Sequence, residues 1–439
     1  MFMVTLDNLV VTNALPAIRK DLGASLTDLQ WFVDAYILAF ASMLLTASAL
    51  GERLGRRRMF LAGIAVFTAA SATCALATEP WILIVTRALQ GLGGAAVMPL
   101  SLTLLSAAVS EDKRNAAIGI WGGISGLGVA VGPVVGGAVV DGVSWQWIFW
   151  INVPFGILAL PVAARVLSES FGNNRQLDPL GLALSSAGVL AVVWGVIHGP
   201  DGGWTSGAVL GCLLGGAVLL AAFLVWERNT AAPMLPLRLF RSRAFSAINL
   251  VMFTFSLGVF GAVFLLAQYL QVAMHYTPLE AGVRIMPWSL APIVVAPLAG
   301  LLADRVGIRA LVVTGQLCLT TALAWMATIT TTAVHYGAYV PSLVLAGIGM
   351  GLTYAPAATV VMATADPADR GMASGANNTI RQVGVAMGVA ILASIFASHG
   401  GYSSAADFID GLVPAIYTGA SVVSVGACAA LLLPGRPRH

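Results

Sequence analysis

Long apolar segments recur along this chain, separated by short loops rich in arginine. Segments of about 18 to 25 apolar residues are long enough to cross the roughly 30 Å hydrocarbon core of a membrane as α-helices. Only 9% of the 439 residues are charged and 58% are hydrophobic, whereas a soluble domain carries about 25% charged residues. The pattern predicts an all-α polytopic membrane protein.

We expect about fourteen membrane-spanning helices. They cover residues 1–18, 30–50, 58–78, 81–106, 116–140, 146–166, 178–198, 206–226, 245–272, 281–303, 309–330, 337–362, 373–397 and 410–433. Apart from Arg87 and Arg381, 17 Lys and Arg residues fall on one side of the membrane and 3 fall on or near the other. Because basic loops stay in the cytoplasm, both termini are expected to be cytoplasmic.

Two parts of the sequence repeat each other. The loop Glu52-Arg53-Leu-Gly55-Arg56 has a counterpart 252 residues later, Asp304-Arg305-Val-Gly307-Ile-Arg309. Three further matches follow at offsets of 256 or 257, and they pair Pro99 with Pro356, Arg114 with Arg370 and Gly119 with Gly375. Matches in one order indicate an internal duplication. We expect a six-helix half at 1–166, two inserted helices and linkers at 167–244, and a second six-helix half at 245–439.

A row of glycines marks the fifth span. Gly128, Gly132 and Gly136 recur every four residues, with Pro133 and Gly137 beside them. A face without side chains lets a neighbouring helix approach closely, and a proline inside a helix removes a backbone donor and bends it. A tight helix-packing seam is the simplest interpretation of this row.

Charged side chains inside the spans need an explanation because each costs about 2.5 to 3.5 kcal/mol on insertion scales. Asp7 lies twelve residues before Arg19, which places it about 18 Å below the outer surface. Asp34 lies about one turn inside the outer end of the second span. Desolvation favours the protonated form of such carboxyls, so each could exchange a proton or balance a cationic compound. The alternatives are a structural hydrogen bond for Asp7 and a helix-dipole role for Asp34.

Two arginines also lie inside spans, each close to a glutamine. Arg87 and Gln90 are in the fourth span, and Arg381 and Gln382 are in the thirteenth. A buried arginine needs an acceptor and favours ionisation of a nearby carboxyl. A permanent ion pair or a bond to a backbone carbonyl is the alternative for Arg87, and structural and functional roles are equally open for Arg381 and Gln382.

Several motifs resemble those of one family. Residues 52–57 resemble the signature loop between the second and third helices of the major facilitator superfamily, and residues 87–93 resemble its fourth-helix motif. Residues 128–137 resemble the antiporter motif of its proton-driven exporters. Residues 6–16 resemble the first-helix motif of its fourteen-helix drug:proton antiporters. Residues 31–36 look like the second helix of quaternary-ammonium multidrug exporters and antibiotic self-resistance pumps.

The resemblance implies a major facilitator fold, whose two six-helix halves enclose a substrate path near the membrane midplane. It implies a multi-pass, monomeric antiporter in a bacterial cytoplasmic membrane that exports hydrophobic, cationic drugs or antibiotics in exchange for protons. It also assigns Asp7, Asp34, Arg87 and Gln90 to coupling. A cytoplasmic gate would consist of Glu52, Arg53, Gly55, Arg56, Asp304 and Arg305, for which a solvated arginine-rich turn is the alternative.

Other functions are less consistent with the sequence. Neither of the two lysines follows a phosphate-binding glycine loop, and the four cysteines lie in separate apolar segments. We therefore expect no enzyme activity, no cofactor, no metal and no nucleic-acid partner. The remaining alternatives are an exporter of one neutral antibiotic or metabolite, an importer, and a polytopic membrane enzyme or lipid flippase.

Overall fold

The computed structural model describes residues 1–439 except 173–177, 231–232, 333 and 436–439. Side chains inside helices at positions 8, 9, 12, 13, 16, 26, 27, 111, 112, 125, 126, 129, 130, 133, 137, 140, 141, 201, 278 and 304 also lie outside the described part. The helices are α1 (Phe2–Leu22), α2 (Leu26–Leu54), α3 (Arg56–Ala75), α4 (Pro80–Ala108), α5 (Glu111–Gly142), α6 (Trp147–Trp150), α7 (Asn152–Val166), α8 (Pro179–Gly202), α9 (Gly207–Asn229), the 3₁₀ helix η1 (Leu237–Arg241), α10 (Arg243–Val272), α11 (Pro278–Val306), α12 (Ile308–Ile329), α13 (Tyr336–Thr364), α14 (Arg370–His399) and α15 (Ala405–Ala430).

The all-helical fold expected from the apolar segments is confirmed for the described residues. Twelve helical segments among them are long and apolar enough to cross a membrane. The sixth of the expected spans, 146–166, consists of the short helix α6 followed by α7. Helices α1 and α5 are two further long helices, each containing side chains that are not described. The count of fourteen spans stays a prediction.

Helices that are related by the sequence repeat begin and end at matching residues. Helix α2 begins after a capping box formed by Ser25 and Asp28, and α11 begins after a capping box formed by Thr277 and Glu280, 252 residues later. In each box the side chains satisfy backbone N–H groups that the first helical turn leaves unpaired. Helices α4 and α13 are likewise related at both ends by 256 residues.

The turns that follow α2 and α11 have the same backbone conformation. Gly55 adopts φ 114° and ψ 123°, and Gly307 adopts φ 91° and ψ 138°. These positive φ angles are costly for residues with a Cβ atom. The glycine in each loop of the repeat therefore lets one helix end and the next begin two residues later.

Glycines also set the distance between neighbouring helices within each repeat. A Cβ atom on Gly93 of α4 would lie 2.6 Å from the backbone nitrogen of Phe67 on α3. The equivalent atom on Gly349 of α13 would lie 2.8 Å from the backbone nitrogen of Leu319 on α12. Such backbone contacts are typical of membrane helices that pack through small residues.

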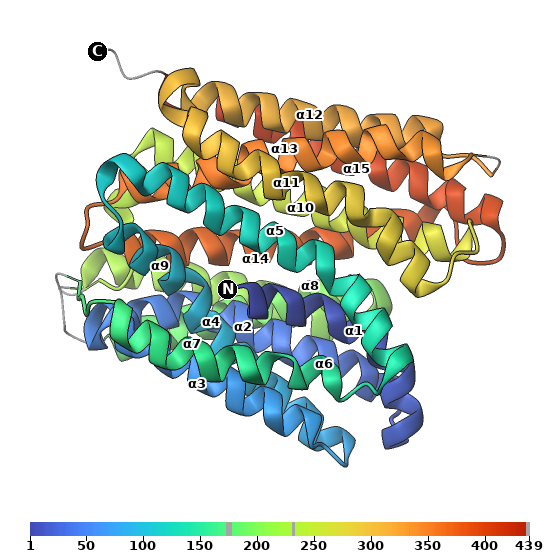
Figure 1. Ribbon diagram of the computed structural model, residues 1–439, viewed down its shortest axis with the longest axis horizontal. Coiled ribbons are helices and arrows are strands. Elements are labelled where there is room, and N and C mark those ends of the chain that lie inside the picture. Colours follow the sequence, from blue (N-terminus) through green and yellow to red (C-terminus); the bar gives the residue numbers. More distant parts are fainter. Residues whose placement is uncertain (173–177, 231–232, 333, 436–439) are drawn as a thin grey trace.

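The helices form an elongated bundle in which α1 to α7 lie mostly on one side and α10 to α15 on the other (Figure 1). Two seams join these groups: α5 packs along α11, and α2 packs along α14. Helix α8 contacts both α2 and α14, and α9 packs mainly against α8. Helices α8 and α9 therefore lie beside the second seam.

Both seams depend on a small residue at an equivalent position. A Cβ atom on Gly119 of α5 would lie 2.8 Å from the carbonyl oxygen of Ala296 on α11. On the other seam, a Cβ atom on Gly375 of α14 would lie 2.2 Å from Oγ of Ser48 on α2. The close contacts of the two seams thus lie at equivalent positions of the sequence repeat.

The close contact between α11 and α13 gives a direct test of this packing. A Cβ atom on Gly347 would lie 2.2 Å from the carbonyl oxygen of Trp288, so we expect Gly347→Ala to destabilise the fold by about 1–3 kcal/mol through overpacking. The matched control is Gly211→Ala on α9, where an added Cβ meets nothing within 4 Å. Thermal denaturation of purified protein should show a lower Tm for Gly347→Ala only, and equal Tm values for the two variants would contradict the packing argument.

Candidate functional site

The structure joins Asp7 on α1 to Arg87 on α4. These two side chains form an ion pair with 2.5 Å between Oδ2 and Nη1, and each is 1% exposed. Their helices are distant in the sequence but adjacent in the fold. Because removing two charges from water is costly, such a pair requires further hydrogen bonds to be stable.

Neighbouring amides provide those hydrogen bonds. Gln90 accepts a hydrogen bond from Arg87 Nη1 at 2.7 Å, and its Nε2 donates to Asp7 Oδ1 at 2.8 Å. Asn152, the first residue of α7, donates to the same Asp7 oxygen at 3.0 Å. Both amides also donate to Ser71 Oγ on α3, at 3.1 Å each. Three donors from two helices, α4 and α7, therefore surround the Asp7 carboxylate.

Helix α2 contributes the remaining contacts of Arg87. The Nε of Arg87 donates a hydrogen bond to the carbonyl oxygen of Phe32 at 3.0 Å, and the guanidinium carbon of Arg87 lies 4.2 Å from the centre of the Tyr36 ring. Helix α2 reaches this position because α4 carries Gly91, on which a Cβ atom would lie 2.5 Å from the carbonyl oxygen of Tyr36. The motif at residues 87–93 thus supplies both the charged group and the close helix contact.

This arrangement couples the charge of Asp7 to the position of Arg87. Protonation of Asp7 would remove the negative partner, while the bonds from Arg87 to Gln90 and to Phe32 could persist. An unpaired buried cation is costly, so the protonated form favours a conformation in which Arg87 reaches water or another acceptor. The packing of α1 against α4 at this site therefore depends on the charges of both side chains.

Asn152 and Ser71 are not among the residues that the sequence patterns predict. The signal that could have pointed to Asn152 is that it is a lone amide at the start of an apolar segment. Ser71 gives a weaker signal, because hydroxyl groups in helices often bond to their own backbone. Asp34 lies partly buried on α2 and is not one of the described hydrogen-bond partners of Asp7.

The glycine row of α5 faces α1. A Cβ atom on Gly128 would lie 3.1 Å from Cβ of Thr5, and Gly132 and Gly136 are buried. Helix α5 continues unbroken from Glu111 to Gly142. Pro133 and Gly137 lie outside the residues whose side chains are described, so their roles stay predictions.

A second group of charges lies at what we call the arginine-rich end of the bundle, which holds residues 52–58, 165–172, 227–230, 233–243 and 366–370. Glu52 and Arg56 form a buried ion pair there, with 2.6 Å between Oε2 and Nη2. Arg56 Nη2 also donates to the carbonyl oxygens of Pro367 and Ala368, at 3.1 and 3.0 Å. Arg56 therefore connects the α2–α3 turn to the turn before α14.

An acid from another turn holds the start of α3. Glu169 Oε1 accepts a hydrogen bond from the backbone N–H of Arg57 at 2.9 Å, and its Oε2 accepts one from that of Arg58 at 3.2 Å. A carboxylate at a helix N-terminus is stabilised by the helix dipole. A Cβ atom on Gly55 would lie 2.8 Å from the Glu169 carboxyl carbon, so this glycine also leaves room for the acid.

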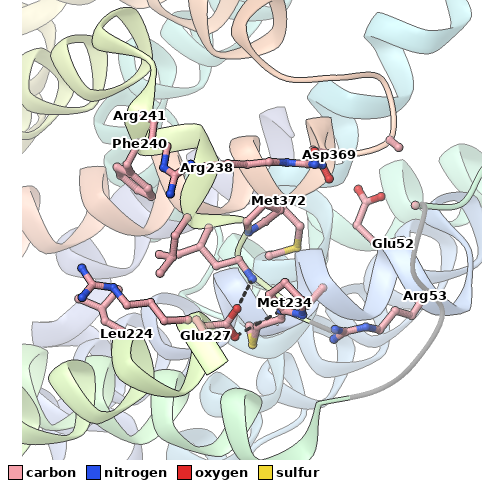
Figure 2. A pocket seen from close by; sticks show the side chains of 18 residues that line it. Glu52, Arg53, Leu224, Glu227, Met234, Arg238, Phe240, Arg241, Asp369 and Met372 are labelled. Atoms are coloured by element: carbon pink, nitrogen blue, oxygen red, sulfur yellow. Dashed lines mark hydrogen bonds and ion pairs between the residues drawn. The ribbon is translucent and has the colours of Figure 1, made fainter. Parts of the chain in front are cut away.

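A cavity of about 1000 Å³ opens beside this network. Its walls come from the end of α2, the end of α9, the connector through η1 and the start of α14 (Figure 2). Figure 2 shows Arg238 of η1 extending to Asp369, with which it forms an ion pair. The hydrogen bond to Asp369 raises the pKa of the Arg238 guanidinium, so this guanidinium stays charged at physiological pH.

Glu227 at the end of α9 holds the connector in place. Its carboxylate accepts backbone hydrogen bonds from Met234 at 3.3 Å and from Leu235 at 3.0 Å.

Among the other residues of the predicted gate, Arg53 is buried beside this cavity. Arg305 is exposed, and the side chain of Asp304 lies outside the described part. Neither Asp7 nor Arg87 lines the cavity, so the two charged groups are separate.

The remaining predicted residues lie on α14. Arg381 and Gln382 are buried, and Arg381 Nη2 donates to Asn378 Oδ1 at 3.2 Å. Neither residue is among the described hydrogen-bond partners of Asp7, which come from α4 and α7.

The family model of the Major Facilitator Superfamily matches residues 1–389. The chain belongs to this superfamily. The major facilitator protein described here is similar to several export and resistance proteins. It is 36% identical to the tetracenomycin C resistance and export protein of Streptomyces glaucescens, over 91% of this chain and 75% of that protein. It is 38% identical to multidrug resistance protein Stp of Mycobacterium tuberculosis, over 91% and 74% of the two chains.

Another relative covers more of both chains. Puromycin resistance protein pur8 of Streptomyces alboniger is 34% identical over 97% of this chain and 86% of its own. Among solved structures, the human organic anion transporter MFSD10 aligns with a TM-score of 0.68 at 14% identity, covering 98% of this chain and 97% of that chain. That likeness concerns the fold alone. The family and the apolar helices show a multi-pass membrane transporter.

A double-mutant cycle tests the Asp7–Arg87 pair in this major facilitator protein. Removing one partner of a buried pair costs about 3–5 kcal/mol because the other charge is left uncompensated. We therefore expect Asp7→Asn and Arg87→Gln each to lower the Tm of the purified protein. The double variant should lose less stability than the two single losses added together. Additive losses would mean that the two charges do not interact.

A distance measurement tests the connection through Arg56. Spin labels at Leu54→Cys and Asp366→Cys, both exposed, can be placed on a background without the native cysteines. We expect Glu52→Gln to lengthen or broaden the distance distribution, because Arg56 loses its charged partner. Glu79→Gln is the control, since Glu79 is exposed in the α3–α4 turn. An unchanged distribution in Glu52→Gln would show that this pair does not hold the turns together.

Proposed function

We propose that this chain is a proton-coupled exporter of hydrophobic drugs or antibiotics in the cytoplasmic membrane of a bacterium. The observation that carries the proposal is the buried Asp7–Arg87 pair, in which one carboxyl group accepts bonds from three side chains. Relatives that are named as export and resistance proteins support the outward direction of transport. Family membership supports a transporter in place of an enzyme.

We further propose an arrangement of fourteen spans in a monomer. Residues 1–166 and 245–439 form the two halves, and residues 167–244 contribute the two inserted helices. The arginine-rich end faces the cytoplasm together with both termini, because basic loops favour that side. Equivalent capping boxes at Ser25 and Thr277 support the two repeats.

Transport would proceed by rocking of the halves against each other. The α5–α11 and α2–α14 seams are closed at Gly119 and Gly375, and Arg56 joins the turns at the arginine-rich end. This conformation therefore corresponds to a closed cytoplasmic side. Opening it requires Arg56 to leave the carbonyl groups of Pro367 and Ala368.

Proton binding at Asp7 would bias this equilibrium. Asp34 and Gln90 are the further residues that we assign to coupling, and Gly128, Gly132 and Gly136 let α5 move closely along α1. Because the Asp7 carboxylate is already paired with Arg87, it offers no unpaired charge to a cationic compound in this conformation. The charge preference for the substrate therefore depends on other buried residues.

Drug accumulation in bacteria that lack their own exporters tests the function. Cells that express the full chain should accumulate several-fold less puromycin or ethidium than control cells, and a proton uncoupler should abolish the difference. We expect Asp7→Asn to accumulate drug like the control cells while staying in the membrane. The matched variant Asp21→Asn changes an exposed acid of the same helix and should retain transport.

Other outcomes separate the alternatives. Efflux of one compound from a broad panel would indicate a dedicated antibiotic exporter. Efflux that persists with the uncoupler, or in a well-expressed Asp7→Asn variant, would contradict proton coupling through this residue.

A further inference from the structure

Arg381 is a second arginine that lies deep between the helices. It is the twelfth residue of α14, which begins at Arg370, so it lies about 16 Å along the helix from the arginine-rich end. A hydrocarbon core of about 30 Å would place it near the membrane centre. Its side chain is 6% exposed.

The partners of Arg381 differ from those of Arg87. Its Nη2 donates to Asn378 Oδ1 at 3.2 Å, and its guanidinium carbon lies 5.7 Å from the centre of the Tyr354 ring. Within the described part of the chain, no carboxylate forms an ion pair with it. Arg87, in contrast, has Asp7 at 2.5 Å. Arg381 is therefore a buried cation whose internal partners are neutral, an arrangement that costs free energy.

The tyrosine ring next to this cation stacks on an aromatic ring from the other group of helices. Tyr354 of α13 stacks on Trp121 of α5, with 5.9 Å between ring centres and 10° between ring planes. Trp121 Nε1 donates to Ser101 Oγ at 3.1 Å, which fixes its ring. The stack crosses from α13 to α5, the two helices that meet where the halves face each other.

Amide groups extend the polar surface beside Arg381. Asn377 is partly exposed, and its Nδ2 donates to Asn249 Oδ1 on α10 at 3.0 Å. Asn378 lies on the same turn of α14 as Asn377. The side-chain amides of these residues are neutral donors and acceptors of hydrogen bonds. The surroundings of Arg381 thus combine one positive charge, neutral amides and flat aromatic faces.

We propose that Arg381 is the anion-binding residue of the substrate site and that the site takes planar aromatic compounds with a carboxylate or another anionic oxygen. A guanidinium group forms two parallel hydrogen bonds with a carboxylate, and the aromatic part of the compound would lie against the Trp121–Tyr354 stack. Asn378 holds the guanidinium in position. The proposal rests on the exporter function, and it replaces a cationic substrate with an anionic one.

Binding of a matched pair of compounds tests this site. We would titrate 2-naphthoate and 2-naphthamide into the purified full chain in lipid nanodiscs by calorimetry and subtract the heat from empty nanodiscs. The two compounds share their rings and differ in charge. We expect the wild type to bind naphthoate about tenfold more tightly, since a charge-assisted pair is about twice as strong as a neutral hydrogen bond.

Variants assign the preference to Arg381. Arg381→Gln should bind both compounds equally, with its naphthamide affinity unchanged, which shows that the site is still folded. Arg381→Lys should keep part of the preference, because the charge remains while the two-point contact is lost. The control is Arg284→Gln, which removes an arginine that also lies over a tyrosine ring, 3.6 Å from the centre of Tyr276, and should keep the full preference.

Three results would overturn the proposal: equal affinity of the two compounds for the wild type, binding of neither, or a preference that survives in Arg381→Gln. The accumulation assay is independent of this measurement. A charge preference without efflux of any compound would reject the exporter function and leave the anion site in place. Efflux without a charge preference would reject the anion site and leave the exporter function in place.

Discussion

An arginine that is removed from water requires an acceptor, and this requirement organises much of the bundle. Arg87 is held by the Asp7 carboxylate, the Gln90 amide and the Phe32 carbonyl oxygen. These contacts bring together α1, α2 and α4, which also share apolar clusters of buried residues. At the arginine-rich end, Arg56 joins two turns in the same way, with one acid and two carbonyl groups.

The internal repeat extends from sequence to geometry. Gly55 and Gly307 adopt the same turn conformation, and Gly93 and Gly349 make the same backbone contact with the preceding helix. The charged groups do not follow this symmetry, because the Asp7–Arg87 pair lies on one side and Arg381 on the other. A scaffold with repeated turns and helix contacts therefore holds different charged groups in its two groups of helices.

Much of the fold could be predicted because membrane helices are long, apolar and separated by distinctive loops. Intramembrane charges are rare enough for Asp7, Arg87 and Gln90 to stand out individually. Asn152 could not be found with the same certainty, since one amide at a helix start has many structural roles. The contacts of Arg56 were harder to predict because Arg56 reaches the turn before α14 through the backbone carbonyls of Pro367 and Ala368. Every residue has a backbone carbonyl, so the sequence does not show which ones accept such bonds.

The connector after α9 has a consequence for the speed of opening. Arg238 on this connector pairs with Asp369 in the turn before α14, and Glu227 anchors the connector to the end of α9. In the transport cycle that we propose, opening of the arginine-rich end requires Arg238 to separate from Asp369 or α9 to travel with α14. Breaking this contact would add to the activation barrier, so we expect α8 and α9 to affect the turnover rate even without contact with the transported molecule.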